Sequence, residues 1–378
     1  MTVAYPHIAD RLFGPAHAIE PNALRAIVEG PIGRRVLSGE SIGGKQAARS
    51  AEIRRQRLAS VAGATMMVAG ADGISEYALT EDGIAILSIA GVLSRRYDLF
   101  SSLCGWTTYD GLGASLQAAL NDERVNAILF DIDSPGGEAA GMLDIADQII
   151  AGRDVKPIWA VADSQAASAA YALGASADRL FLPRLAQVGS IGAVIIHVDQ
   201  SAQDQTDGLK YSAIFSGSRK LDGWPHAALS SSAREAFQTR VDHVRQSFAA
   251  LVGRQGRISS SAALKTEAEM FSDADAVQIG LADAVGSFDQ VLSELSEFVQ
   301  QRKSSALSPD QQDGIDASAP TPRADAPPNP WDEVIASVNA GLPAHAVVPQ
   351  QHTRAAASLW DEVVAKTNSR HATTETSR

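Results

Sequence analysis

The chain of 378 residues is short of cysteine, lysine and long apolar runs, and each shortage narrows its chemistry. Its one cysteine, Cys104, excludes an internal disulfide and any zinc site built on several cysteines. The eight histidines show no metal-binding spacing, so we expect neither a metal nor a cofactor. Only seven of the 32 basic residues are lysines, which leaves few candidates for lysine chemistry.

The charge balance and the lack of long apolar runs also argue against two kinds of partner, nucleic acid and membrane. Acidic residues number 44, which gives a formal charge of −12, and no basic stripe suits a phosphate backbone. No apolar run reaches the roughly 18 to 20 residues that cross a bilayer. The first ten residues lack the basic start and apolar run of a signal peptide. We therefore expect a soluble protein with no nucleic-acid or membrane partner.

From residue 83 onward, apolar runs alternate with amphipathic stretches, which predicts strands and helices in turn. Strands are expected at 83–93, 126–133, 156–162, 179–183 and 192–198, and helices at 109–120, 138–150, 164–176 and 231–255. This alternation is typical of an α/β core of stacked strand-turn-helix units. We expect residues 1–75 to form an N-terminal arm and residues 76–299 to form this core.

The composition changes after about residue 300 to Ser, Ala, Pro, Asp and Gln, so residues 300–378 are expected to form a flexible tail. Within it, a nine-residue stretch that begins at Trp331 recurs at Trp360, and each copy is predicted as a short amphipathic helix. Two aromatic-anchored helices on a tether are typical of binding motifs that act by avidity. The alternative is that both helices dock back on their own core.

Two segments of small residues can carry chemistry. Ser134-Pro-Gly-Gly follows a predicted strand, and backbone N–H groups there can stabilise an oxyanion. Ser168 lies among alanines in the first turn of the next predicted helix, which leaves its hydroxyl accessible. The N–H groups of Gly137 and Ala169 can then form a two-donor oxyanion hole. Each segment also has a structural explanation, as a glycine turn or as a small residue in a close-packed helix.

In order and spacing, these segments resemble the signal peptide peptidase A family of serine proteases, within the Clp/crotonase superfamily, and above all the head maturation proteases of lambda-like phages. The resemblance extends from about Pro6 to Phe288. Its motifs are Pro6-His-Ile-Ala, Thr108-Tyr-Asp-Gly, Asp131-Ile-Asp-Ser-Pro-Gly-Gly, Ala167-Ser-Ala, Val188-Gly-Ser-Ile-Gly, Ser216-Gly-Ser-Arg-Lys-Leu-Asp-Gly and Gly280-Leu-Ala-Asp. It implies a Clp/crotonase-like α/β fold, a protease domain over residues 76–299, a nucleophile at Ser168 and a base at Lys220.

The chemistry of a serine nucleophile agrees with a lysine base. A lysine can take the serine proton when burial lowers its pKa from about 10.4 to roughly 7 to 8. Lys220 lies in a Gly/Ser-rich loop that can fold over the site, whereas Lys210 is expected in a solvated loop. His197 is the rival base, because it follows Ser168 on a later predicted strand; a core or strand-end histidine is the alternative. The resemblance also gives Ser190 a supporting role as a hydrogen-bond partner of the lysine.

The resemblance implies a phage or prophage endopeptidase that cleaves a scaffold protein, the portal protein and its own tail inside an assembling prohead in the host cytoplasm. It also implies a homo-oligomer whose sites are shared between subunits. The linker between residues 303 and 328 is the expected region of self-cleavage, and the motifs at Trp331 and Trp360 are expected to bind scaffold or capsid. Two alternatives stay open: a cytoplasmic peptidase that degrades signal-peptide remnants, and a non-catalytic assembly protein that acts through its tail. A crotonase-type acyl-CoA enzyme would not need Ser168 and Lys220 together.

Overall fold

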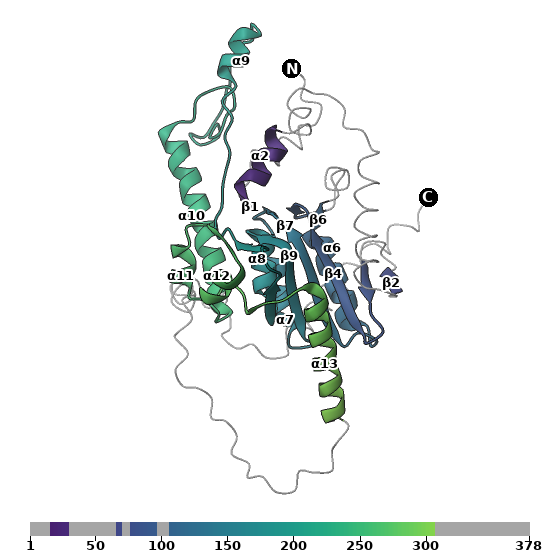
Figure 1. The fold of residues 1–378 in the computed structure, drawn as a ribbon. Coiled ribbons are helices and arrows are strands. Elements are labelled where there is room, and N and C mark those ends of the chain that lie inside the picture. Colours follow the sequence, from purple (N-terminus) through teal and green to yellow (C-terminus); the bar gives the residue numbers. More distant parts are fainter. Residues whose placement is uncertain (1–15, 30–65, 70–75, 97–105, 307–378) are drawn as a thin grey trace, which may run out of the picture. The chain divides into compact units, whose positions relative to one another are not determined.

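The computed structural model describes residues 16–29, 66–69, 76–96 and 106–306 (Figure 1). Their strands are β1 (His17–Ile19), β2 (Met66–Ala69), β3 (Glu76–Leu79), β4 (Ile84–Ala90), β5 (Leu93–Ser94), β6 (Thr107–Thr108), β7 (Ala127–Ser134), β8 (Gly136–Glu138), β9 (Ile158–Ala167), β10 (Arg179–Leu182), β11 (Gln187–Gly189), β12 (Met270–Ser272) and β13 (Ala284–Val285). Their helices are α2 (Pro21–Glu29), α6 (Tyr109–Asn121), α7 (Met142–Gly152), α8 (Ala169–Ala175), α9 (Ser201–Thr206), α10 (Ser231–Arg254), α11 (Ser260–Lys265), α12 (Asp273–Gln278) and α13 (Phe288–Ala306).

The central sheet is mixed. Its strands follow the order β12-β11-β9-β7-β4-β3-β2, and β10 pairs with both β9 and β13. The middle strands β4, β7, β9 and β11 run parallel, whereas β2, β3 and β12 pair antiparallel. A second, smaller sheet has the order β1-β8-β5-β6. Helices connect the parallel strands, as βαβ units require, and the expected α/β class is confirmed.

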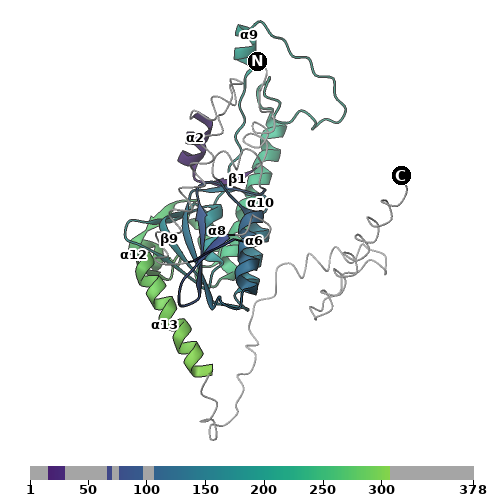
Figure 2. The ribbon, with the colours of Figure 1, turned by 90° about the vertical axis from the view of Figure 1, so that its right-hand side faces the viewer.

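Alternate residues of the middle strands face two separate cores. Ile128, Phe130 and Ile132 of β7 belong to the core that contains α6, α7 and α8. Leu129 of the same strand belongs to the core that contains Val291 and its neighbours on α13. Figure 2 shows α13 and α6 on opposite sides of the sheet. Burial on both faces explains why these strands appear in the sequence as nearly continuous apolar runs.

The predicted helix at 164–176 is wrong at its start, because β9 continues to Ala167 and α8 begins at Ala169. Alanine favours a helix, but Gln165 and Ala166 pair with β11 on one edge of the strand. This pairing satisfies backbone groups that a helix would otherwise have to satisfy. The residue between strand and helix is Ser168.

Two further sequence predictions are corrected near the same end of the sheet. In place of a tight turn at 134–137 and a helix from residue 138, β7 extends to Ser134, β8 follows, and α7 starts at Met142. β8 exists because β1 and β5 pair with its two edges. The strand predicted at 192–198 is a single bridge at Val194, which pairs with His17.

Elements from the range predicted as an N-terminal arm join the sheets, since β1 pairs with β8 and β2 pairs with β3. At the other boundary, α13 runs to Ala306, past the expected domain end at residue 299. The linker, Trp331 and Trp360 lie outside the described residues, so the tail motifs stay predictions. Across the described ranges, no helix is both long and apolar enough to span a bilayer.

Candidate active site

Ser168 lies at the sharp junction between β9 and α8. Its backbone has φ 53° and ψ −119°, a combination that residues with a side chain rarely adopt. Such a conformation costs about 1–3 kcal/mol and persists only where its surroundings hold it. Here the Ser168 N–H donates to the Gly189 carbonyl at 2.8 Å, and the Ser168 carbonyl accepts from the Ala172 N–H at 3.0 Å. A serine on a strained strand-to-helix turn is the geometry that presents a nucleophile.

The predicted accessibility of the Ser168 hydroxyl is wrong for this structure, because the hydroxyl is buried and has no hydrogen-bond partner. The residue is 1% exposed, and within the described chain its Oγ contacts neither donor nor acceptor. An unsatisfied buried hydroxyl costs about 1–3 kcal/mol. Ser88 and Ser94 share this feature, but only Ser168 of the three combines it with a positive φ. A nucleophile whose hydrogen-bond partners are supplied only by the substrate and the base would also lack a partner in this structure.

Gly136 brings β8 against the residues on either side of Ser168. A Cβ atom built on Gly136 would lie 2.9 Å from the Ala167 carbonyl oxygen and 3.0 Å from the Ala169 amide nitrogen. Gly136 also has φ +93°, which favours glycine. The nearest atom to this Cβ position is the Ala18 carbonyl oxygen, at 2.3 Å, so glycine allows β1 and the Ala169 N–H to approach the same point. As the first residue of α8, Ala169 has no acceptor within the helix.

Gly137, the other predicted oxyanion donor, lies within β8 rather than at a helix N-terminus. A Cβ atom on it would lie 1.8 Å from the Leu93 carbonyl oxygen, so glycine is required for β5 to approach. The structure thus brings Gly137 and Ala169 to the same end of the sheet, on two neighbouring segments. This juxtaposition agrees with a pair of amides around one oxygen, although the predicted helix dipole is absent at Gly137.

Ser190 lies one strand away from the nucleophile candidate. It follows β11, whose Gly189 is opposite Ala167 in the sheet. Ser190 is 4% exposed, has φ 55°, and donates its N–H to the Glu269 carbonyl at 3.0 Å. Two serines with positive φ therefore lie on neighbouring strand ends at the carboxyl end of the sheet. This placement is compatible with the supporting role predicted for Ser190.

Lys220 is not brought to Ser168 within the described chain. It is exposed, as are all residues from 205 to 220, and its N–H donates to the Gly217 carbonyl at 3.0 Å. Since the Ser168 hydroxyl has no partner, Lys220 does not hydrogen-bond to it. The predicted pair of Ser168 and Lys220 is therefore not assembled within a single copy of the chain.

The rival base His197 does not contact Ser168 either. Its Nε2 lies 3.3 Å from the carbonyl oxygen of Trp224, four residues after Lys220. Burial lowers the pKa of Lys156, but its Nζ donates to the Ala119 and Asp122 carbonyls. It precedes β9, whereas Ser168 follows that strand, so Lys156 lies at the wrong end to act as the base.

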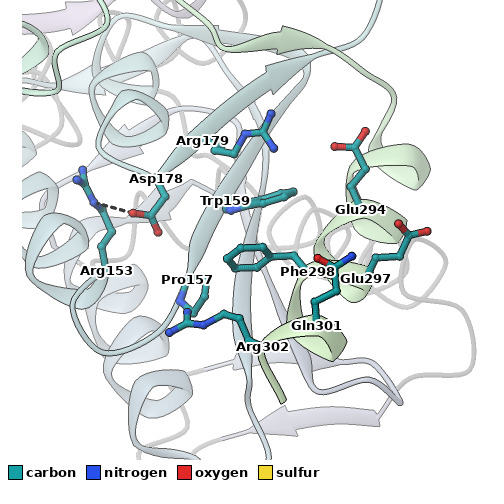
Figure 3. Close-up of a pocket in the computed structure, with 10 residues that line it drawn as sticks. All are labelled: Arg153, Pro157, Trp159, Asp178, Arg179, Glu294, Glu297, Phe298, Gln301 and Arg302. Carbon is teal, nitrogen blue, oxygen red and sulfur yellow. Dashed lines mark ion pairs between the residues drawn. The ribbon is translucent and has the colours of Figure 1, made fainter. Parts of the chain in front are cut away.

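A cavity of about 540 Å³ lies at that opposite end of β9 (Figure 3). Trp159 and Phe298 form its aromatic wall with ring centroids 5.7 Å apart, and Arg179 lies over Trp159. Ser168 and the glycines of β8 do not line it. The described residues include no cluster of His, Cys, Asp or Glu that could hold a metal ion. The catalytic candidate is therefore the strained serine and its neighbouring amides.

Sequence reasoning missed two parts of this site. It assigned the oxyanion donor to Gly137 and left Gly136 without a role, although both belong to the same motif. It also missed β1, which pairs with β8 directly beside these glycines. A strand of three residues, such as β1, is too short to show an apolar pattern, and nothing in its local sequence indicates which strand it pairs with.

The chain is similar in sequence to one protein family and to several known proteins. Residues 151–302 match the family described as peptidase family S49. The chain is 33% identical over 309 residues to capsid assembly protease C of Escherichia phage lambda, covering 79% of this chain and 67% of that protein. It is 37% identical over 212 residues to head-tail preconnector protein GP5 of Enterobacteria phage P21, covering 56% of this chain and 42% of that protein. Among solved structures, ClpP1 of Listeria monocytogenes aligns with 13% identity and a TM-score of 0.34, over 53% of this chain and 91% of that chain.

Proposed function

The chain belongs to peptidase family S49, and from this membership we propose that it is a serine endopeptidase of phage capsid assembly with Ser168 as its nucleophile. The observation that carries the proposal is the Ser168 hydroxyl, which is buried, unpartnered and held on a strained junction beside two backbone amides. Ser88 and Ser94 also have buried hydroxyls without a partner, but of these three serines Ser168 alone has a positive φ.

The proposed reaction proceeds by acyl transfer. Ser168 Oγ attacks a peptide carbonyl while a base accepts its proton, and the carbonyl oxygen becomes an oxyanion. The N–H groups of Gly137 and Ala169 stabilise this charge, a contribution that typically reaches about 10²–10³ in rate for one donor. The base then protonates the leaving amine, and water hydrolyses the acyl-enzyme by the same path.

We assign the base to Lys220 of a neighbouring copy of the chain in a homo-oligomer. Lys220 is exposed and does not contact Ser168 of its own chain, so a second copy can supply it. The same loop exposes apolar side chains, since Ile214 is fully exposed and Phe215 is 52% exposed. Burial of such side chains against another subunit would stabilise an oligomer and would also desolvate the lysine, which lowers its pKa.

The proposed substrates are the scaffold protein, the portal protein and the enzyme's own tail, processed within the assembling prohead in the host cytoplasm. The support is similarity to one relative described as a capsid assembly protease and to another described as a head-tail preconnector. The motifs at Trp331 and Trp360 are proposed to bind scaffold or capsid.

The direct test compares cleavage of fluorescein-labelled casein and of the co-expressed scaffold protein by the wild type and three variants. Ser168→Ala and Lys220→Ala are expected to lose activity by about 10³-fold or more. Lys210→Ala, which removes another exposed lysine ten residues away, is the matched control and is expected to retain it. Equal cleavage by wild type and Ser168→Ala would refute the nucleophile and favour a non-catalytic assembly role.

A mixing experiment tests whether the site is shared. If Lys220 serves a neighbouring subunit, mixed oligomers of Ser168→Ala and Lys220→Ala chains contain sites with both intact residues. The mixture is then expected to recover up to about a quarter of wild-type activity after subunit exchange, from random pairing of the chains. Dyads formed within one chain would give no recovery above the sum of the two variants.

A further inference from the structure

The three-residue strand β1 lies between two other segments beside Ser168. On one edge, the His17 N–H donates to the Val194 carbonyl at 2.9 Å, and the Val194 N–H donates to the His17 carbonyl at 2.9 Å. On the other edge, β1 pairs antiparallel with β8. Without β1, the edges of β8 and Val194 would form an open slot of the width of one strand. An extended peptide binds such edges through its backbone.

The direction of each carbonyl in β1 follows from this pairing. Successive residues of a strand present their backbone groups to opposite edges, so Ala18 faces β8 if His17 faces Val194. The register places Ala18 opposite Gly137. The flanking bonds fall on alternate residues, as expected: the Ala139 N–H donates to the Ala16 carbonyl at 3.2 Å, and the Glu20 N–H donates to the Pro135 carbonyl at 2.7 Å. The Ala18 carbonyl thus faces the amide assigned to the oxyanion hole.

The Ala18 carbonyl oxygen and the second predicted oxyanion donor, Ala169, both lie close to Gly136. The Ala18 oxygen lies 2.3 Å from the Cβ position built on Gly136, and that same point is 3.0 Å from the Ala169 nitrogen. Ala18 itself is fully buried. A backbone carbonyl of the protein therefore occupies the space beside the amides of Gly137 and Ala169, where a substrate carbonyl has to lie for Ser168 to attack it.

Building on the function proposed above, we propose that β1 occupies the substrate-binding groove of its own catalytic domain as a bound peptide would, with Ala18 at the residue whose carbonyl Ser168 attacks. The groove takes an extended peptide, antiparallel to β8 and to Val194. The buried state of the Ser168 hydroxyl agrees with an occupied groove. A protein substrate binds after β1 has left.

The contacts of β1 and α2 show how the segment is held. Ile19, Leu24 and Ile27 border a small apolar cavity together with Leu93 and Trp106. Leu24 is 2% exposed and anchors α2, whereas Arg25 on the same helix pairs with Glu29 in solvent. In sequence, 36 residues (30–65) connect α2 to β2, a length that can reach roughly 100 Å when extended. Release of β1 therefore does not require β2 to leave the central sheet.

The size of Ala18 also predicts substrate preference. Because Ala18 is fully buried beside the glycines of β8, the groove at this position is matched to a small side chain. Substrates are expected to carry alanine or another small residue immediately before the cleaved bond.

A reversible lock tests the proposal in the full-length chain. His17→Cys and Val194→Cys, in a Cys104→Ser background, place two cysteines at a hydrogen-bonded antiparallel pair, where Cα atoms are about 5.5 Å apart and a disulfide can form. Oxidation is expected to reduce cleavage of fluorescein-casein at least tenfold, and reduction to restore it. The single variant His17→Cys, treated in the same way, is the control for oxidation itself. Undiminished cleavage by fully cross-linked protein would overturn the proposal.

A second pair of variants loosens the segment instead. Leu24→Ala removes the buried anchor and is expected to raise kcat/KM for casein by roughly tenfold, because occupancy of the groove by β1 falls. Arg25→Ala on the exposed face of the same helix is the matched control and is expected to change the rate by less than about twofold. A lower rate in Leu24→Ala than in Arg25→Ala would show that β1 is a fixed wall of the site, which overturns the proposal.

A binding measurement separates this proposal from the proposed function. A fluorescein-labelled peptide of the sequence of residues 14–23 is titrated into locked Ser168→Ala protein, and its anisotropy is measured in the oxidised and the reduced states. We expect binding in the reduced state and at least tenfold weaker binding after oxidation. Equal affinity in both states, or no binding in the reduced state, overturns the groove assignment. If the peptide binds only in the reduced state but the protein with an intact Ser168 cleaves no substrate, the groove assignment holds and the proposed protease function is refuted.

Discussion

Replacing Gly136 by alanine tests the close approach of β8 to the nucleophile. The added methyl group would lie 2.3 Å from the Ala18 carbonyl oxygen, 2.9 Å from the Ala167 carbonyl oxygen and 3.0 Å from the Ala169 nitrogen. All three neighbours are backbone atoms, so no flexible side chain can move aside. The methyl group would also occupy the space beside the Ala169 amide, where the proposed mechanism places the oxyanion.

The structure predicts two effects of Gly136→Ala, a loss of stability and a loss of activity, and they can be measured separately. A residue with a side chain at φ +93° loses about 1–2 kcal/mol of stability from backbone strain alone. Displacement of the Ala169 amide adds a catalytic loss of about 10²–10³ in kcat/KM. Gly256→Ala is the matched control, since Gly256 has φ +77° and no atom within 4 Å of its Cβ position. Gly256→Ala therefore introduces the same kind of backbone strain without a steric overlap.

The measurements are urea unfolding followed by circular dichroism, and the kcat/KM for casein cleavage. Gly256→Ala is expected to lose about 1 kcal/mol of stability and to keep its activity. Gly136→Ala is expected to lose more stability than this and at least about a hundredfold in activity. If Gly136→Ala matches Gly256→Ala in both quantities, the placement of Gly136 beside Ala169 is wrong, and with it the oxyanion site.

Two further predictions concern charge and backbone strain. The side chains of Arg124 and Tyr77 donate to the Asp122 carboxylate and hold its pKa below its usual range. A lowered native pKa stabilises the fold above the unfolded value of about 4 and loses this effect as the pH falls. Asp122→Asn is therefore expected to lower the free energy of unfolding by about 2 kcal/mol at pH 7, measured by urea unfolding. The difference in stability between wild type and variant should narrow below about pH 4, and a difference that stays constant with pH would contradict the linkage. Ser168→Gly, which removes the penalty of φ 53°, is expected to be about 1 kcal/mol more stable than Ser168→Ala, and equal melting temperatures would count against strain at the nucleophile.

Local pattern accounts for most of the elements that build the core. The apolar run before Ser134 and the amphipathic stretch from Tyr109 match β7 and α6 to within a residue or two. The helix predicted at 231–255 corresponds to α10. These elements were predictable because each buries a face whose spacing along the chain is visible in the sequence.

The errors occurred where pairing with a distant strand outweighs local preference. The alanine-rich stretch before Ser168 was predicted as a helix, but β11 pairs with it and extends β9 to Ala167. Likewise, β8 forms from a glycine motif because β1 and β5 lie on its two edges. A strand such as β8, one of whose partners lies more than a hundred residues away, has no signature of its own.

For the candidate site, the sequence by itself determined which residues are chemically suitable: a serine among alanines, a pair of glycines and a small set of lysines. Only the tertiary structure decided their geometry. It placed Ser168 on a strained junction, brought Gly136 against Ala169, left Lys220 exposed and inserted β1 beside them. The physical reason is that residue chemistry is a local property, whereas backbone strain, strand insertion and the distance between nucleophile and base arise from hydrogen bonds between segments far apart in the chain.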